Sequence, residues 1–339
     1  DTIYYLGNGQ FALLTDFFDF LSSGSNITTY LNDFVNNVKE SILEIDEIEY
    51  DLNVVVSYTF GREHLYEDAK CGLDEAVKRS DIVRYSNDSS IKEQIEAKKN
   101  MEVIKMVKIA LENYKIISYF QPIINNKTRV VEKYESLVRL VDENGNILSP
   151  HAFLDISKKG NYYNKITHRV LENSFKILKQ ISTKISINLS SLDIEKEETR
   201  NILFELLEEH KEDRHRVIFE LLEDESVKDF NVIKNFIKKV KSMGVLIAID
   251  DFGAGYSNFE RLLEFSPDIL KIDGKLVKNI ANDVYSKNIV ETIVSFTKKQ
   301  KIITIAEFVE NEQIYNILAE LGVDYSQGYY FGKPENINL

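Results

Sequence analysis

Short apolar runs alternate with longer amphipathic stretches between residues 131 and 331 of this 339-residue chain. The short runs are rich in β-branched residues, as buried strands are: VEKYESLV, KISINLS, RVIFELL, VLIAIDDF, ILKID, IITIAEF and VDYSQGYYF. The longer stretches repeat apolar residues every three or four positions, as helices do: THRVLENSFKILKQ, TRNILFELLEEHKE, DFNVIKNFIKKVKSMG, YSKNIVETIVSFTKKQ and NEQIYNILAELG. Parallel strands require crossover helices, so the alternation predicts an α/β fold, a (β/α)8 TIM-like barrel.

The first part of the chain has a different pattern. Residues 3–14 form two β-rich runs joined at Asn8-Gly9, and Asn-Gly between such runs favours a hairpin. Helix-like and strand-like stretches then follow in turn. We therefore predict a partial α+β domain over residues 1–88, followed by a barrel domain over residues 89–339 that begins with a connecting helix over 89–114.

Polar residues stand at or near the ends of the strand runs. They are Glu135, Asn188, Glu220, Asp250, Asp251, Lys271, Asp273, Glu307 and Gln327. An isolated buried carboxylate costs several kcal/mol, so a shared cation is expected where parallel strands converge. Carboxylate and amide oxygens suit hard divalent ions, and none of the five histidines lies at a strand end. The pattern therefore predicts a site for Mg²⁺ or Mn²⁺.

The composition limits the classes of partner. The 55 acidic and 42 basic residues give a formal net charge of -13, which disfavours binding to a nucleic acid polymer. Cys71 is the single cysteine, which is typical of a reducing compartment such as the cytoplasm. There is no apolar run of about 18 residues, so we expect no membrane span in this fragment. The chain starts at Asp1 without a signal segment, and we interpret it as part of a longer protein whose N-terminal regions could tether it to a membrane.

A series of short motifs follows the order of the strand runs. They are Gln121-Pro122-Ile123, Glu135-Ser136-Leu137-Val138-Arg139, Asn188-Leu189-Ser190, Glu220-Leu221-Leu222-Glu223, Asp250-Asp251-Phe252-Gly253-Ala254-Gly255-Tyr256-Ser257, Lys271-Ile272-Asp273, Ala306-Glu307-Phe308-Val309-Glu310 and Gln327-Gly328-Tyr329. Together they resemble the successive motifs of the EAL-domain cyclic-di-GMP phosphodiesterases, over about residues 98 to 336. The resemblance implies an EAL-type barrel that acts on cyclic-di-GMP.

The same resemblance implies a role for each matching residue. The implied ligands of two Mg²⁺ or Mn²⁺ ions are Glu135, Asn188, Glu220, Asp250, Asp251, Asp273 and Glu307. The implied catalytic residues are Lys271, Glu307 and Gln327. The implied substrate-binding residues are Gln121, Leu137, Arg139 and Glu310. Glu223, Gly253 and Gly255 would anchor or shape the loop after Asp251, which in the family couples homodimer formation to metal occupancy.

Three residues depart from the family pattern. Ser136 stands where the family has Ala, and Leu222 stands where it has Thr. Phe308 replaces a Gly directly after Glu307. We expect Phe308 to matter most, because glycine permits a positive φ or a close backbone approach that a bulky residue disfavours.

The front segment YLGNGQF, residues 5–11, resembles the signature hairpin of a GGDEF diguanylate cyclase domain, of which only the C-terminal half would be present. Gly9 and Gln10 stand where cyclases carry metal-binding and catalytic acids. We therefore expect no cyclase activity. Binding of GTP stays open, and the segment could be a regulator or a passive scaffold.

These observations predict a metal-dependent phosphodiesterase that hydrolyses cyclic-di-GMP to linear pGpG. One alternative is a catalytically silent cyclic-di-GMP receptor, and another is a different barrel metalloenzyme such as an enolase-superfamily lyase. Each acid taken singly is also typical of a helix cap, and Lys271 could simply pair with Asp273. The complete ligand set disfavours the receptor, while the Asp250-Asp251 doublet with Arg139 favours phosphodiester chemistry.

Overall fold

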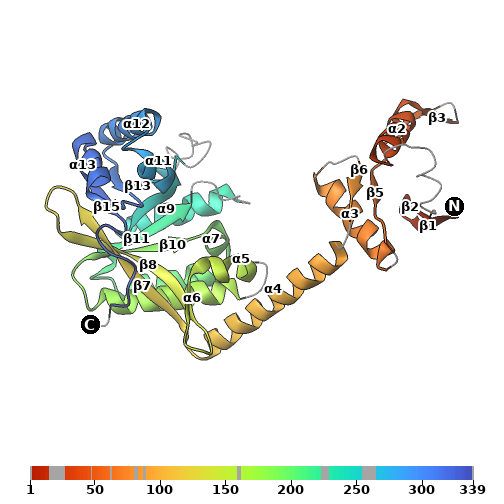
Figure 1. The fold of residues 1–339 in the computed structure, drawn as a ribbon. Coiled ribbons are helices and arrows are strands. Elements are labelled where there is room, and N and C mark those ends of the chain that lie inside the picture. Colours follow the sequence, from red (N-terminus) through yellow and green to blue (C-terminus); the bar gives the residue numbers. More distant parts are fainter. Residues whose placement is uncertain are drawn as a thin grey trace. The chain divides into compact units, whose positions relative to one another are not determined.

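The computed structural model of the protein describes residues 2–14, 27–46, 48–61, 63–79, 83–86, 89–158, 162–222, 229–253 and 265–337. The chain divides into two compact units, residues 1–101 and 102–339. Helix α4 (Ser89–Glu112) contributes residues to both units. Figure 1 gives the labels used for the helices and strands.

The front unit opens with the hairpin that the sequence predicts. Strands β1 (Thr2–Gly7) and β2 (Gln10–Leu14) pair antiparallel. Asn8 and Gly9 in the turn have φ values of 51° and 72°. Two positive φ angles are typical of the turn that Asn-Gly favours, because its twist matches that of the flanking strands.

The rest of the front unit mixes helices with short strand pairs. Its elements are α2 (Ile27–Glu40), β3 (Ile42–Ile45), β4 (Ile48–Asp51), β5 (Val56–Tyr58), α3 (Leu65–Arg79) and β6 (Val83–Tyr85). β3 pairs antiparallel with β4, and β5 pairs parallel with β6. This mixture is α+β, as expected from the alternating pattern of the sequence.

The second unit is built around a closed barrel of eight strands (Figure 1). They are β7 (Ile116–Asn125), β8 (Val131–Val141), β10 (Lys184–Leu189), β11 (Val217–Leu222), β12 (Leu246–Phe252), β13 (Ile269–Ile272), β14 (Ile303–Ala306) and β15 (Tyr325–Gln327). The order around the barrel is β7, β8, β10, β11, β12, β13, β14 and β15, and β15 pairs with β7 to close it. The predicted barrel is therefore present.

One strand departs from the regular (β/α)8 pattern. β7 runs antiparallel to both of its neighbours, β8 and β15, whereas the other neighbouring strands run parallel. A short connection, residues 126–130, joins β7 to β8 in place of a crossover helix. β7 is also absent from the strands expected from the apolar pattern, because Pro122 interrupts its run with a residue that lacks an N–H group. β9 (Ile147–Leu148) extends the sheet beside β8.

Helices lie against the outside of the barrel (Figure 1). They are α5 (Leu154–Lys158), α6 (Tyr163–Leu178), α7 (Ser191–Glu195), α8 (Glu197–Glu209), α9 (Phe230–Ser242), α11 (Gly274–Asn279), α12 (Val284–Gln300) and α13 (Glu312–Leu321), with 3-10 turns at Pro150–Ala152 and Arg214–Arg216. The five longest of them coincide with the five amphipathic stretches of the sequence. Their apolar faces and the outward-facing residues of the strands form the main core.

A second, smaller core fills part of the barrel interior. Ile123, Ile218, Ala248, Ile269 and Ile305 are buried there against one another. On four strands the residue two positions further along is polar: Glu220 follows Ile218, Asp250 follows Ala248, Lys271 follows Ile269 and Glu307 follows Ile305. Side chains two apart in a strand share a face, so the apolar layer forms the floor of a polar layer at the carboxyl ends of the strands.

Candidate metal centre and active site

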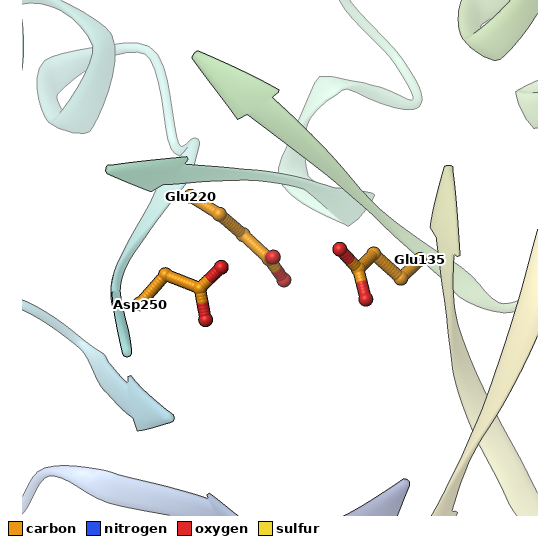
Figure 2. A group of neighbouring side chains, drawn as sticks. All are labelled: Glu135, Glu220 and Asp250. Atoms are coloured by element: carbon orange, nitrogen blue, oxygen red, sulfur yellow. The ribbon is translucent and has the colours of Figure 1, made fainter. Parts of the chain in front are cut away.

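Three carboxylates from strands on one side of the barrel converge in its interior. Glu135 lies on β8, Glu220 on β11 and Asp250 on β12, and all three are buried. Figure 2 shows their side chains pointing toward one another. One oxygen of each lies within 4.8 Å of an oxygen of the other two. This spacing is compatible with binding a single metal ion.

Lys271 on β13 places a positive charge among these acids. Its side chain is fully buried, and Nζ lies 2.7 Å from Glu220 Oε2, 2.8 Å from Glu307 Oε1 and 3.0 Å from Asp250 Oδ1. Glu135 Oε2 lies 3.6 Å away. One ammonium group thus lies close to four carboxyl groups, and the alternative of a simple Lys271–Asp273 pair does not describe this arrangement.

Amide side chains fix the orientation of Glu135. Asn188 Nδ2 donates to Glu135 Oε1 at 2.7 Å, and Gln327 Nε2 donates to Glu135 Oε2 at 2.6 Å. Gln327 Nε2 also lies 3.1 Å from Gln121 Oε1, and Gln121 in turn donates to the carbonyl of Gly332. The sequence-predicted residues from β7, β8, β10 and β15 therefore form one hydrogen-bonded group.

The buried acids differ in the direction in which their pKa values are shifted. Burial raises the pKa of Glu220 to about 8, against the opposing effect of Lys271. Burial also raises the pKa of Glu307 well above its usual range, with Lys271 again opposing the shift. For Glu135, burial is outweighed by Lys271 and by the amides of Gln327 and Asn188, so its pKa is lowered. The four carboxylates hold the pKa of Lys271 well above its usual value in spite of burial, so Lys271 stays charged.

A second group of acids adjoins the first. Asp250, Asp251 and Glu307 offer oxygens within 4.8 Å of one another. Asp251 has a positive φ of 55°, and its backbone N–H donates to Asp250 Oδ1 at 3.0 Å. Burial, Asp250 and Asp273 raise the pKa of the Asp251 carboxyl to about 6. Asp273 caps α11 by accepting from Lys275 N at 2.6 Å, so it lies beside this group while also serving as a helix cap.

The donor set fits a divalent cation. Glu220 Oε1 and Gln327 Oε1 are buried and have no hydrogen-bond partner among the described residues. Buried acceptors without partners are rare in folded proteins, and each carries a desolvation cost. A hard cation would satisfy such oxygens, and the surrounding ligands are all oxygen donors.

Some expected residues lie farther from the cluster. Arg139, half-buried, donates to the carbonyl of Val138 at 2.8 Å and lies over the ring of Tyr119. Leu137 shares its strand face with Glu135 and Arg139. Glu310 is largely exposed and lies 4.0 Å from Lys278 Nζ.

The loop-anchoring residues are described only in part. Glu223 and Gly255 lie outside the described residues. Gly253 has a φ of 98°, and a Cβ placed on it would lie 2.6 Å from Leu276 Cδ1. Position 253 therefore requires glycine for both its backbone conformation and its close packing.

Phe308 adopts the backbone conformation for which glycine is suited. Its φ is 52°, in the left-handed region that costs a non-glycine residue about 1–2 kcal/mol. The ring packs on Gly274 at the start of α11, and Lys278 Nζ lies 4.4 Å from the ring centroid. Phe308 is 52% exposed, whereas Glu307 beside it is buried. The ring therefore lies outside the Lys271 cluster.

The sequence pattern missed two buried polar residues near the site. Lys133 shares the inward face of β8 with Glu135, and its Nζ lies 2.8 Å from the centroid of the Tyr325 ring without a hydrogen bond. Burial lowers the pKa of Lys133 to about 7. Asp193 forms a capping box with Ser190 just after β10. The sequence carried a signal for each residue. Lys133 stands two positions before Glu135, which places both on one face of a strand. Asp193 stands three positions after Ser190, which is the spacing of a capping box.

The model of the EAL domain family matches residues 104–334, which include every strand of the barrel. The chain belongs to the EAL domain family. The matched residues include all the carboxylates that converge in the barrel. The family that the sequence motifs resemble is therefore confirmed.

Curated relatives carry names that concern one nucleotide. The cyclic di-GMP phosphodiesterase PdeF of Escherichia coli is 30% identical over 247 residues, covering 71% of this chain and 33% of PdeF. The cyclic di-GMP phosphodiesterase PdeB of Shewanella oneidensis is 26% identical over 321 residues, covering 91% of this chain and 38% of PdeB. The chain thus spans little more than a third of the length of these relatives.

A solved structure supports the same fold. The EAL enzyme Bd1971 in its cAMP- and cyclic-di-GMP-bound form superimposes with a TM-score of 0.67 at 25% identity, covering 78% of this chain and 74% of Bd1971. Among the described helices of the present chain, none is long and apolar enough to cross a membrane.

We predict that Lys271→Met lowers the free energy of unfolding by about 3–5 kcal/mol, because Glu220, Asp250 and Glu307 lose their compensating charge. Urea unfolding in EDTA would measure the loss. Adding Mn²⁺ should stabilise the variant more than the parent protein, since a cation replaces the missing charge.

The matched control is Lys241→Met, which removes a partly exposed ion pair with Asp268 at 2.9 Å. Its loss should stay below about 1 kcal/mol and should not respond to Mn²⁺. An equal Mn²⁺ effect on the parent and both variants would contradict the assignment of Lys271 as the compensating charge of the cluster.

Proposed function

We propose that the EAL domain is a metal-dependent phosphodiesterase that hydrolyses cyclic-di-GMP to linear pGpG. The observation that carries this proposal is the joined pair of carboxylate groups around Lys271, which share Asp250. Support also comes from the names of the relatives PdeF and PdeB and from the cyclic-di-GMP-bound form of Bd1971.

The proposed cofactor is a pair of Mg²⁺ or Mn²⁺ ions. Glu135, Asn188, Glu220 and Asp250 would hold one ion, and Asp251, Asp273 and Glu307 would hold the second together with Asp250. Such ions, when bound, lower the pKa of a water molecule and stabilise the charge that develops on a phosphodiester. Asp250 belongs to both groups of carboxylates, which supports two ions that lie next to each other and share Asp250 as a ligand.

The remaining polar residues are proposed to position the reacting groups. Lys271 would donate hydrogen bonds to the attacking water or to a phosphate oxygen, because its ammonium lies among the carboxylates of the site. Gln327 Oε1 has no partner among the described residues and could accept from that water. Glu307, within reach of Lys271, would complete the group. The water oxygen would attack phosphorus, the phosphate ester bond to one sugar oxygen would break, and the proton lost by the water would end on that leaving oxygen, which opens the ring of the substrate.

Substrate contacts are proposed at the rim of the site. Arg139 would bind a phosphate oxygen, because its half-buried guanidinium lies four residues after Glu135 on the same face of β8. Gln121, Leu137 and Glu310 are the other proposed contacts. We further propose a homodimer formed through the barrel, near the loop after Gly253, and action in the cytoplasm.

The decisive experiment is to incubate the protein with cyclic-di-GMP and Mg²⁺ or Mn²⁺ and to separate the products. We expect pGpG from the parent protein. Glu135→Gln should lower the rate by more than the roughly 10–100-fold typical of residues behind a metal ligand, because it removes a ligand charge.

Glu132→Gln on the same strand is the matched control, since Glu132 accepts from Tyr325 and Asn125 outside the cluster. Its rate should equal that of the parent. Binding of cyclic-di-GMP without release of pGpG under either metal would instead support the receptor alternative.

Phe308→Gly should keep hydrolysis at or above the parent rate. Glycine adopts a φ of 52° without a Cβ penalty, and the Glu307 backbone is held by its own hydrogen bond to the Ile272 carbonyl at 3.2 Å. Steady-state kinetics would measure the change. Phe308→Ala removes the ring but keeps the Cβ, so it separates crowding by the ring from backbone strain. A hydrolysis rate that is tenfold or more lower in Phe308→Gly would show that the Phe308 ring is needed to position Glu307.

For the front segment we propose a degenerate GGDEF-like role, as regulator or scaffold, with GTP as its candidate ligand. The match to PdeB extends over most of this segment as well as the barrel. Gly9 lies in the hairpin turn and Gln10 is the first residue of β2, and neither carries a carboxylate. We therefore predict no cyclic-di-GMP from GTP and Mg²⁺ in a product assay, and the appearance of product would overturn the degenerate assignment.

A further inference from the structure

Asp193, just after β10, accepts more hydrogen bonds than a helix cap requires. Ser190 N donates to Oδ2 at 2.9 Å and Ser190 Oγ at 2.7 Å, which completes the cap of α7. Two further donors come from α6: Thr167 Oγ1 lies 2.7 Å from Oδ1, and Tyr163 OH lies 3.1 Å from Oδ2. Asp193 is 2% exposed. The carboxylate therefore links the segment that follows β10 to α6.

The same helix is also hydrogen-bonded to β8. Ser174 Oγ donates to Ser136 Oγ at 2.8 Å, and Ser136 is adjacent to Glu135. Ser190, held through Asp193, comes two residues after Asn188. Helix α6 is thus hydrogen-bonded to a residue next to Glu135 and, through Asp193, to a residue close to Asn188, and these two side chains are hydrogen-bonded to each other.

Strand pairing already brings these two residues near each other, because the register of β8 with β10 places Glu135 opposite Ser186, two residues before Asn188. The register between β8 and β10 ends at Ile187 paired with Ser136. Asn188 lies one residue beyond that pair, and its backbone register is instead with Glu220 on β11. The hydrogen bonds through α6 add a second connection between β8 and the segment after β10, beyond the point where the pairing of these two strands ends.

We propose that α6 positions the Glu135–Asn188 pair for metal binding, with Thr167 and Tyr163 acting through Asp193, and Ser174 acting through Ser136. This inference rests on the proposed function, since it concerns the same ligands. These are positioning residues, because the bonds on the helix side reach Glu135 and Asn188 only through neighbouring residues. Residues behind metal ligands commonly contribute about 10–100-fold to metal affinity or activity.

Thr167→Val tests the connection, because valine keeps the branched shape and removes the hydroxyl. Thr297→Val is the matched control: Thr297 is also a buried helical threonine, but its hydroxyl donates to Ile293 and Val294 of its own helix. Titration calorimetry with Mn²⁺ would give the affinity, steady-state kinetics kcat and KM, and thermal unfolding the stability of each variant.

We expect about tenfold weaker Mn²⁺ binding and a lower kcat in Thr167→Val, with parent values in Thr297→Val at a similar melting temperature. Thr167→Ser should restore both, since it returns the hydroxyl. Ser174→Ala should weaken Mn²⁺ binding from the other end of the connection, and it serves as the second variant if Thr167→Val folds poorly.

Equal Mn²⁺ affinity in Thr167→Val, Ser174→Ala and Thr297→Val would overturn the proposal. Failure of the proposed function is distinguishable, because a parent protein that binds Mn²⁺ but releases no pGpG refutes the phosphodiesterase alone. The Mn²⁺ affinities would still decide the role of α6 in that case.

Discussion

Compensation of charge inside a closed barrel is the constraint on which this structure depends. Four buried carboxylates surround Lys271, whose ammonium lies within 3.0 Å of three of them. Without that charge the cost of burying the acids would exceed what neighbouring apolar contacts return. The lysine therefore allows carboxylates to be buried at the strand ends.

The barrel interior has an apolar layer that contributes to stability and a polar layer that contains the buried carboxylates and Lys271. An apolar floor of Ile218, Ala248, Ile269 and Ile305 supports the acids from below, and each polar residue stands on the same strand face two positions later. Hydrogen bonds from α6 act from the outside of the barrel at β8 and at the end of β10. The buried carboxylates are thus supported from inside and from outside the barrel, as a site on rigid elements requires.

Local patterns predicted much of this arrangement and missed what depends on distant contacts. The strand-end acids could be found because each interrupts an apolar run within a few residues. The antiparallel direction of β7 could not, since Pro122 disguised the strand and direction is set by closure of the barrel. The bonds of Asp193 to α6 also join residues 26 and 30 positions apart. The positive φ of Phe308 followed from the glycine of the family pattern, whereas the side on which its ring packs required the fold.

The direction of β7 determines where the preceding chain joins the barrel. In a regular (β/α)8 barrel the first strand starts at the amino ends of the strands, opposite the ligands. Here Ile116 pairs with Leu140, so the chain enters at the carboxyl-end rim only a few residues after α4 ends at Glu112. The next residue, Ile117, pairs with Arg139. A twist or pull exerted along α4 would therefore reach first the rim where the buried carboxylates lie, without crossing the apolar floor.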